Sequence, residues 1–288
     1  MPPRPEAPEA DEPIRSRGNP LAQRLRALKD KGVRGGEGLM LLEGGKLVAE
    51  ALAAGVEVVE AAASARFGDA RGEARLVAEL AARAVPLRRM ESALLSSLSE
   101  LETSPGVLAI ARRPPFEETS LYRGVPLLII AVGLQNPGNL GGLFRSAEGA
   151  GATGAYLTEG TADPFSWKAL RGAMGSAFRL PHVRGISART ALERARGRGL
   201  QVVATDAHAS GAYDTVDYRR PTALLFGAEG SGLAGEIAAS ADRRVRIPMH
   251  PPVESLNVGV AAGVLLFEAA RQRRAGASRA LAKARARS

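Results

Sequence analysis

The chain has 288 residues, 45% of them hydrophobic, which is enough for one large or two moderate domains with a buried core. It has no cysteine, so thiol nucleophiles, disulfides and cysteine-ligated metal sites are excluded. Its three histidines are not at metal-ligand spacing, so we expect no metal. A net charge of +9 favours a polyanionic partner, because neutralising phosphates supplies affinity. No apolar run is long enough to cross a bilayer and the first residues lack the apolar core of a signal peptide, so we expect a cytoplasmic protein with no membrane partner.

Residues 1–18 combine proline with acidic residues and almost nothing apolar, which predicts a disordered leader. Residues 19–113 predict a small α/β domain, in which a basic helix from Pro20 to Lys31 precedes alternating apolar strands and short helices. This domain has a basic edge and no catalytic constellation, so we interpret it as a binding module. Residues 114–124 are polar and contain proline, as expected for an interdomain linker.

A second α/β domain is predicted over residues 125–271. Continuous apolar strands that alternate with helices are typical of a parallel sheet, and ligands bind such sheets beyond the carboxyl ends of the strands. The tail, residues 272–288, is basic and has no acid, so we expect it to fray unless it meets a polyanion. The strands of this domain are expected at residues 125–133, 154–158, 178–183, 200–206, 222–227 and 243–249.

Three loops are expected at the ligand-binding edge of this sheet. In the first, residues 133–152, Asn139 is a candidate helix cap and Arg145 lies six residues beyond it, so both side chains can reach the mouth of the sheet. The glycines of this loop do not match the dinucleotide-binding fingerprint. The second loop, residues 226–233, is a glycine-rich turn with one carboxylate, Glu229, and it lacks the lysine and hydroxyl residue of a phosphate-binding P-loop.

The third loop follows the last strand and places Ser255 and Asn257 at the start of a long helix. Ser255 alone can be an ordinary helix cap, because its hydroxyl can accept a hydrogen bond from a free helical N–H group. The helix is apolar nearly all round, which predicts that it is buried. Gly259 and Gly263 lie inside it, and because each costs roughly 1 kcal/mol relative to alanine, they indicate close approach of another segment.

Taken together, three segments resemble, in order and spacing, the three motifs of the SpoU (TrmH-like) RNA 2'-O-ribose methyltransferases of the SPOUT superfamily. These segments are NPGNLGGLFRSAEGAGA, LLFGAEGSGL and IPMHPPVESLNVGVAAGVLLFEA, and they span the second domain. The segment KALRGAMGSAFRLP is similar to the region between the first two motifs. The first domain, through NPLAQRLRALKDKGVRGGEGLMLLEGGKLVAEALAAG and SPGVLAIARR, resembles the small L30e-like substrate-binding domain that many members carry at the N-terminus.

The resemblance implies transfer of a methyl group from S-adenosylmethionine to a ribose 2'-hydroxyl of RNA, without a metal. It also implies a parallel sheet whose C-terminal chain is threaded into a deep trefoil knot, and a homodimer that buries the C-terminal helix. The implied catalytic residues are Asn139, Arg145, Glu229, Ser255 and Asn257. The implied cofactor contacts come from Phe226, Gly227, Glu229, Gly232, Ile247, Met249, Ser255, Leu256 and Val258.

Roles for these residues follow from the same resemblance. Arg145 activates the 2'-hydroxyl together with an RNA phosphate, or stabilises the forming alkoxide, since a guanidinium with a pKa above about 12 is a poor base. Asn139 positions Arg145 or the ribose, Ser255 and Asn257 shape the pocket, and Glu229 orients a loop or a partner subunit's arginine. Ribosomal RNA is the favoured substrate, and transfer RNA is the alternative. A non-catalytic RNA-binding protein and a nucleotide-dependent oxidoreductase are the other classes of function considered.

Overall fold

The computed structural model describes residues 12–31, 38–101, 106–230 and 232–285, with side chains described up to residue 276. The chain divides into two compact units. One comprises Met1–Pro114 with Phe165–Trp167, and the other comprises Pro115–Pro164 with Lys168–Ser288. Within the described residues, none of the helices is both long and apolar enough to span a membrane.

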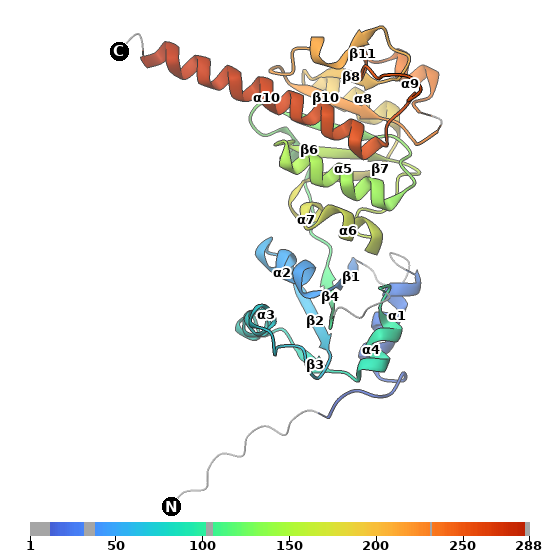
Figure 1. The fold of residues 1–288 in the computed structure, drawn as a ribbon, viewed down its shortest axis with the longest axis vertical. Coiled ribbons are helices and arrows are strands. Elements are labelled where there is room, and N and C mark those ends of the chain that lie inside the picture. The colour runs from blue at the N-terminus through green and yellow to red at the C-terminus, as the bar shows by residue number, and fades with distance from the viewer. Residues whose placement is uncertain (1–11, 32–37, 102–105, 231, 286–288) are drawn as a thin grey trace, which may run out of the picture. The chain divides into compact units, whose positions relative to one another are not determined.

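The first unit is a four-stranded mixed sheet with helices packed against it (Figure 1). Its strand order is β1-β4-β2-β3, in which β4 is antiparallel to both neighbours and β2 is parallel to β3. The leucines of the first helix recur on one face at helical spacing and are buried against β4 and α4, which confirms the predicted helix. The elements are α1 (Pro20–Lys31), β1 (Leu39–Glu43), α2 (Gly45–Ala53), β2 (Val58–Ala63), α3 (Arg71–Ala82), β3 (Leu87–Arg89), α4 (Ser92–Leu98) and β4 (Val107–Arg112).

The segment before α1 is partly structured, contrary to the expectation of a disordered leader over residues 1–18. Ile14 forms a parallel bridge with Met90, because its N–H donates to the Arg89 carbonyl at 2.9 Å and its carbonyl accepts from the Glu91 N–H at 3.0 Å. The single apolar residue near the end of the leader thus extends the sheet edge beside β3. The remaining part of that expectation, residues 1–11, lies outside the described residues.

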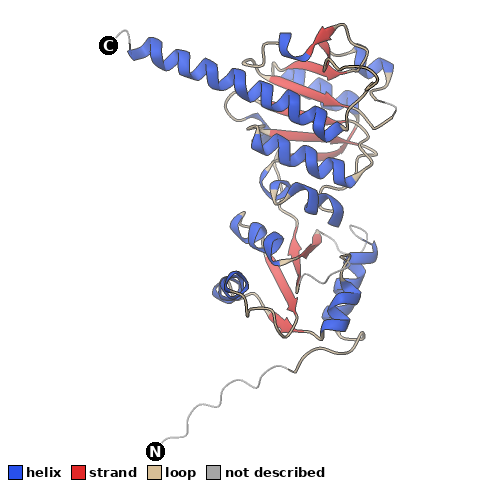
Figure 2. Ribbon diagram, viewed as in Figure 1, coloured by secondary structure: helices blue, strands red, loops and turns tan. Residues whose placement is uncertain are grey.

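The second unit is a seven-stranded sheet in which every neighbouring pair is parallel, in the order β7-β6-β5-β10-β8-β11-β9. Its central strands are buried on both faces, with α8 on one side and α5 and α10 on the other (Figures 1 and 2). The predicted parallel α/β sheet is confirmed. Its elements are η2 (Glu118–Tyr122), β5 (Leu127–Ala131), α5 (Pro137–Gly149), β6 (Gly154–Thr158), α6 (Trp167–Ala173), α7 (Ser176–Arg179), β7 (His182–Ile186), α8 (Ala188–Gly197), β8 (Gln201–Thr205), β9 (Gly211–Ala212), η3 (Tyr213–Thr215), β10 (Thr222–Phe226), α9 (Gly235–Ala239), β11 (Arg243–Arg246) and α10 (Val258–Arg285).

One predicted strand is displaced. The expected strand at residues 178–183 is a short helix, α7, followed by β7 at His182–Ile186. Gly175, with φ of 90°, is in the left-handed region that favours glycine, and it starts α7 within the apolar run. The short strands β3 and β9 were not predicted, because two or three residues carry no readable alternation.

The expected linker at residues 114–124 is instead packed onto the second unit. Leu121 in η2 is fully buried, and the Tyr156 hydroxyl donates to the Glu118 carboxylate, which also pairs with Arg194. Burial raises the pKa of the Tyr156 phenol, so it remains a hydrogen-bond donor. The polar residues of this segment therefore form hydrogen bonds and ion pairs that attach it to the second unit, rather than forming a free linker.

The expected boundary after Arg271 is also wrong, since α10 continues to Arg285. The Arg273 guanidinium donates to four backbone carbonyls, those of Val125, Pro126, Tyr218 and Arg220, at 2.7 to 3.1 Å. Burial lowers the pKa of Arg273. These bonds fasten the helix to the segments that lead into β5 and β10, so the predicted free tail begins as a packed helix.

The close fit of α5 against α6 depends on glycine. A Cβ at Gly141 would lie 2.4 Å from the Ala169 carbonyl oxygen, whereas a Cβ at Gly142 would meet nothing within 4 Å. We expect Gly141→Ala to lower the free energy of unfolding by about 1 to 3 kcal/mol, because the backbone of α6 would have to move away from the new Cβ. Gly142→Ala on the same helix should be neutral or stabilise it by up to about 1 kcal/mol. Urea unfolding of both variants tests this, and equal stabilities would contradict the packing.

Candidate active site

The helices α5 and α10 pack side by side and run in the same direction (Figure 1). Their contacts occur in the same order along both. A Cβ on Gly259 would lie 3.8 Å from the Asn139 carbonyl oxygen, one on Gly263 would lie 3.7 Å from the Ser146 hydroxyl, and one on Gly149 would lie 3.5 Å from Phe267. The glycines predicted to permit close approach therefore face α5, and the two helices begin at the same place.

The helix starts are held by asparagine side chains. Asn136 accepts hydrogen bonds from the N–H groups of Gly138 and Asn139 at 2.9 and 3.3 Å, with Pro137 at the first helical position. The cap of α5 is thus Asn136, and the prediction that Asn139 caps the helix is wrong. An asparagine directly before a proline was the sequence signal that could have identified it. Because the cap lies earlier, Asn139 is in the first turn with its side chain available for another contact.

The start of α10 meets this first turn directly. Asn257 accepts a hydrogen bond from the Gly259 N–H at 2.9 Å, and its amide nitrogen donates to the Asn139 side-chain oxygen at 3.0 Å. Asn257 therefore caps α10 and joins the two helix N-termini. Ser255 lies two residues earlier, is exposed, and does not cap the helix.

The other three predicted catalytic residues do not take part in the contact between Asn139 and Asn257. Arg145 is exposed and lies six residues after Asn139, about 9 Å along α5. No described residue forms a hydrogen bond or an ion pair with its guanidinium, which is open to an external anion. Glu229 is exposed at the tip of the glycine-rich turn. The structure thus brings Asn139 and Asn257 together and does not join Arg145, Glu229 or Ser255 to them.

The glycine-rich turn after β10 is tightly closed. Phe226 is fully buried at the end of β10, and the Gly232 N–H donates to the Ala228 carbonyl at 2.8 Å. A Cβ on Gly227 would lie 2.3 Å from the Gly232 carbonyl carbon, so only glycine fits there. At the carboxyl end of β10 the turn is therefore held closed by backbone packed against backbone.

The segment between β11 and α10, residues 247–257, must cross the sheet edge. It leaves β11, which is separated from β5 by β8 and β10, and it ends at Asn257 against the helix that follows β5. The crossing is about three strand spacings, roughly 14 Å, and passes the carboxyl ends of β8 and β10. This crossing segment contains Ile247 and Met249, which are half-buried, and Leu256, which is 38% exposed.

Of the three histidines, His208 follows β8 and His250 is in the crossing segment, both exposed, whereas His182 is buried away from this edge. His182 begins β7 and its ring packs between Phe116 and Phe144, at centroid distances of 4.8 and 5.2 Å. Burial lowers its pKa to about 4, so the imidazole is neutral near pH 7. The described residues contain no cluster of three or more potential metal ligands.

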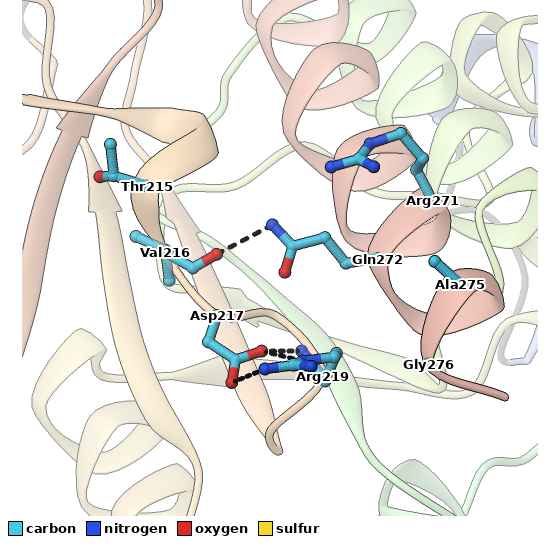
Figure 3. Close-up of a pocket in the computed structure, with 8 residues that line it drawn as sticks. All are labelled: Thr215, Val216, Asp217, Arg219, Arg271, Gln272, Ala275 and Gly276. Carbon is cyan, nitrogen blue, oxygen red and sulfur yellow. Dashed lines mark hydrogen bonds and ion pairs between the residues drawn. The ribbon is translucent and has the colours of Figure 1, made fainter. Parts of the chain in front are cut away.

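An open hollow of about 310 Å³ lies elsewhere, between α10 and the segment after β9 (Figure 3). It is lined on one side by Thr215, Val216, Asp217 and Arg219, which precede the amino end of β10. This hollow is therefore at the opposite end of β10 from the candidate site.

Sequence profiles of two known families match the chain. That of the SpoU rRNA Methylase family covers residues 126–267, and that of the MRM3-like substrate binding domain covers residues 19–109. A protein of Synechocystis sp. named as an uncharacterized tRNA/rRNA methyltransferase is 35% identical over 263 residues, which cover 90% of this chain and 93% of that protein. The similarity thus includes both units.

Two further relatives carry more specific names. The 23S rRNA (guanosine(2553)-2'-O)-methyltransferase RlmP of Bacillus subtilis is 36% identical over 60% of this chain and 67% of its own length. The crystal structure of the SpoU methyltransferase AviRb from Streptomyces viridochromogenes, in complex with AdoMet, has a TM-score of 0.78 and 29% identity, and the match covers 88% of this chain and 98% of that chain.

The contact between Asn139 and Asn257 can be measured by a double-mutant cycle. We expect Asn139→Ala and Asn257→Ala to be coupled by about 0.5 to 1.5 kcal/mol in the free energy of unfolding, since each removes the same hydrogen bond. Asn257→Asp serves as a control, because it keeps the oxygen that caps α10 but replaces the donor that faces Asn139. Additive effects would show that the two helix starts are held independently.

Proposed function

Because this chain belongs to the SpoU rRNA methylase family, we propose that it transfers a methyl group from S-adenosylmethionine to a ribose 2'-hydroxyl of ribosomal RNA. The observation that supports this most directly is the Asn139–Asn257 contact, which joins two helix N-termini beside the crossing segment. The name of the Bacillus relative specifies 2'-O-methylation of 23S rRNA, and the AviRb crystal structure contains AdoMet. Transfer RNA remains the alternative substrate.

The residues at the sheet edge suit this cofactor. The turn at residues 226–233 offers approachable backbone at Gly232, where a Cβ would meet nothing within 4 Å. The crossing segment offers apolar surface from Ile247, Met249 and the partly exposed Leu256. Backbone hydrogen-bonding groups beside apolar side chains match a purine ring and the methylene groups of a methionine chain. We assign the cofactor to the space bounded by these two segments and by Val258 at the start of α10.

When bound, S-adenosylmethionine supplies an electrophilic methyl group on a sulfonium. The chain must then help a 2'-hydroxyl lose its proton, since the neutral hydroxyl is a weak nucleophile. Each helix N-terminus carries about half a positive charge, and α5 and α10 bring two of them to one point. That potential stabilises a forming alkoxide or a neighbouring phosphate.

Arg145 is placed to assist from the surface of α5. Because a guanidinium is a poor base, we assign the exposed Arg145 side chain to bind an RNA phosphate and to stabilise the developing negative charge. We assign Asn139 to position the ribose, and Ser255 with Asn257 to shape the entrance. Glu229, at the exposed tip of its turn, is assigned to orient a neighbouring loop or an arginine of a partner subunit.

We further propose that the protein is a homodimer and that the chain after β11 is threaded as a deep knot. The crossing of residues 247–257 over the carboxyl ends of two strands supports the threading. The prediction that α10 is buried all round does not hold for the single chain, because Val260 and Phe267 are 54% and 49% exposed. Together with Val253 and Leu256, these side chains form an apolar surface that a second copy would cover.

The reaction is tested with radiolabelled S-adenosylmethionine and separately purified large-subunit, small-subunit and transfer RNA. We expect label in one ribosomal RNA, on a ribose that digestion maps as 2'-O-methylated. Arg145→Ala should lower the turnover number by about 10²- to 10³-fold while S-adenosylhomocysteine binding is kept. Arg123→Ala, an exposed arginine outside the site, is the matched control. Near-normal turnover of Arg145→Ala would remove its assigned role, and label only in transfer RNA would change the substrate.

The homodimer is tested by sedimentation. Val260→Asp and Phe267→Asp should shift the protein toward monomer, because each would bury a charge in the proposed interface. Val125→Asp is the control, since Val125 is equally exposed, at 50%, but lies outside this surface. A wild-type protein that sediments as an active monomer would refute the proposal.

A further inference from the structure

The helices of the first unit cover the two faces of its sheet in pairs. α1 and α4 pack on one face through the leucines described above, and α2 and α3 lie on the other (Figure 1). Strands β1, β2 and β3 run in the same direction, because β4 is antiparallel to β1 and β2, and β3 is parallel to β2. The chain therefore leaves β1 for α2, and β2 for α3, at one edge of the sheet.

The starts of α2 and α3 touch at this edge. A Cβ on Gly45, the first residue of α2, would lie 3.5 Å from the Phe67 ring and 3.4 Å from the Leu76 side chain of α3. Phe67 belongs to the loop between β2 and α3, residues 64–70, and its side chain is buried. Exposed residues that flank Gly45 and Phe67 therefore lie close together.

The loop at residues 64–70 is held in place by side chains from β3 and α3. Arg89 in β3 donates through one guanidinium nitrogen to the carbonyls of Ser64 and Phe67, at 2.9 and 2.7 Å. The Gly68 N–H donates to the Glu73 carboxylate of α3 at 3.0 Å. These bonds fix the backbone of the loop, as is common for loops that carry binding residues on a rigid scaffold.

Four exposed cations lie at these two helix starts. Arg71 is the first residue of α3 and Arg75 is one turn further on, Arg66 is in the loop, and Lys46 follows Gly45 in α2. No described residue forms a hydrogen bond or an ion pair with any of the four side chains. We call these four residues the basic cluster.

The basic cluster has more positive charge than its neighbours neutralise. Two carboxylates lie within the same stretch of chain, Asp69 and Glu73, and that of Glu73 already accepts the Gly68 N–H. Arg71 and Arg75 are four residues apart, so the helix places two like charges on neighbouring turns, which destabilises it. An anion bound between them relieves that repulsion. The first unit therefore gains stability when an anion binds here.

The cations of α1, on the opposite face of the sheet, are used within the fold. Arg24 pairs with Glu60 at 3.0 Å, and the Lys29 ammonium donates to the carbonyls of Ser97 and Ser99, at 3.3 and 2.8 Å. Each of these two cations would have to give up a partner to bind an external anion. The basic cluster has no such cost, so it is favoured over α1 as a surface for a polyanion.

We propose that the basic cluster binds the phosphate backbone of the substrate RNA. The choice of RNA as the polyanion rests on the proposed function. Phe67, the aromatic residue of the loop, is buried, so it offers no ring on which a base could stack. The cluster therefore contacts phosphates, adds affinity and orients the RNA, and it does not select the base sequence.

The test is binding of a 23S ribosomal RNA transcript to the full-length protein, measured as a function of salt in the presence of S-adenosylhomocysteine. The cluster variant carries Arg66→Gln, Arg71→Gln and Arg75→Gln. We expect it to bind about 10- to 100-fold more weakly at about 0.1 M salt. It should also lose about two to three units of the slope of log affinity against log salt, because each phosphate contact contributes somewhat less than one unit.

A matched control removes the same charge beside the other face of the sheet. It carries Arg15→Gln, Arg17→Gln and Arg26→Gln, which lie in α1 and in the segment before it. We expect its affinity and its salt slope to stay close to those of the wild type. Equal losses in the two variants would show that net charge alone attracts the RNA, and a greater loss in the control would place the RNA on the α1 face. Either result would overturn the inference.

A lysine variant separates charge from folding. Arg66→Lys, Arg71→Lys and Arg75→Lys keep the cations and should keep the salt slope and most of the affinity, since an ammonium also binds phosphate. Equal loss of slope in the lysine and glutamine variants would overturn a phosphate contact, as would unchanged affinity and slope in the glutamine variant. Binding is measured without methyl transfer, so a protein that binds RNA through the cluster but methylates none would contradict only the proposed function.

Discussion

The arrangement of this site depends on the parallel packing of α5 and α10. Gly259, Gly263 and Gly149 lie at the contacts, where an added Cβ would be 3.5 to 3.8 Å from the neighbouring helix, an ordinary van der Waals distance. The shared direction of the two helices brings both N-termini to one point, where the amide of Asn257 bonds to Asn139. An antiparallel pair would place one C-terminal dipole there and cancel much of the positive potential.

The order of the strands explains why distant segments meet at that point. Because β8 and β10 separate β11 from β5, the chain that leaves β11 must cross their carboxyl ends before α10 can pack on α5. The glycine turn at residues 226–233 follows one of those strands, so the crossing segment passes the turn. The same helix then continues to its anchorage at Arg273, near the amino ends of β5 and β10. One element therefore links the site to the opposite end of the sheet.

Residue spacing and apolar runs in the sequence predict the helices and strands better than the tertiary contacts between them. The leucine spacing of α1 and the apolar runs of the parallel strands were sufficient to place them, and glycine inside α10 predicted close helix contact. The pairing of Asn139 with Asn257 was not derivable from spacing, since 118 residues separate them and tertiary packing alone joins them. Polar composition predicted a linker at residues 115–124 and a free tail at residues 272–276, and both predictions are wrong. The polar side chains there make specific hydrogen bonds, as Glu118 and Arg273 show.

The most direct test of this account is a crystal structure of the protein with S-adenosylhomocysteine. The account predicts that the ligand lies at the carboxyl edge of the sheet, against the backbone of residues 226–229 and 247–249 and beside Leu256 and Val258. Its sulfur should then face the junction of the α5 and α10 N-termini. A ligand bound in the hollow beside Arg219 and Arg271, at the other end of β10, would contradict the central claim.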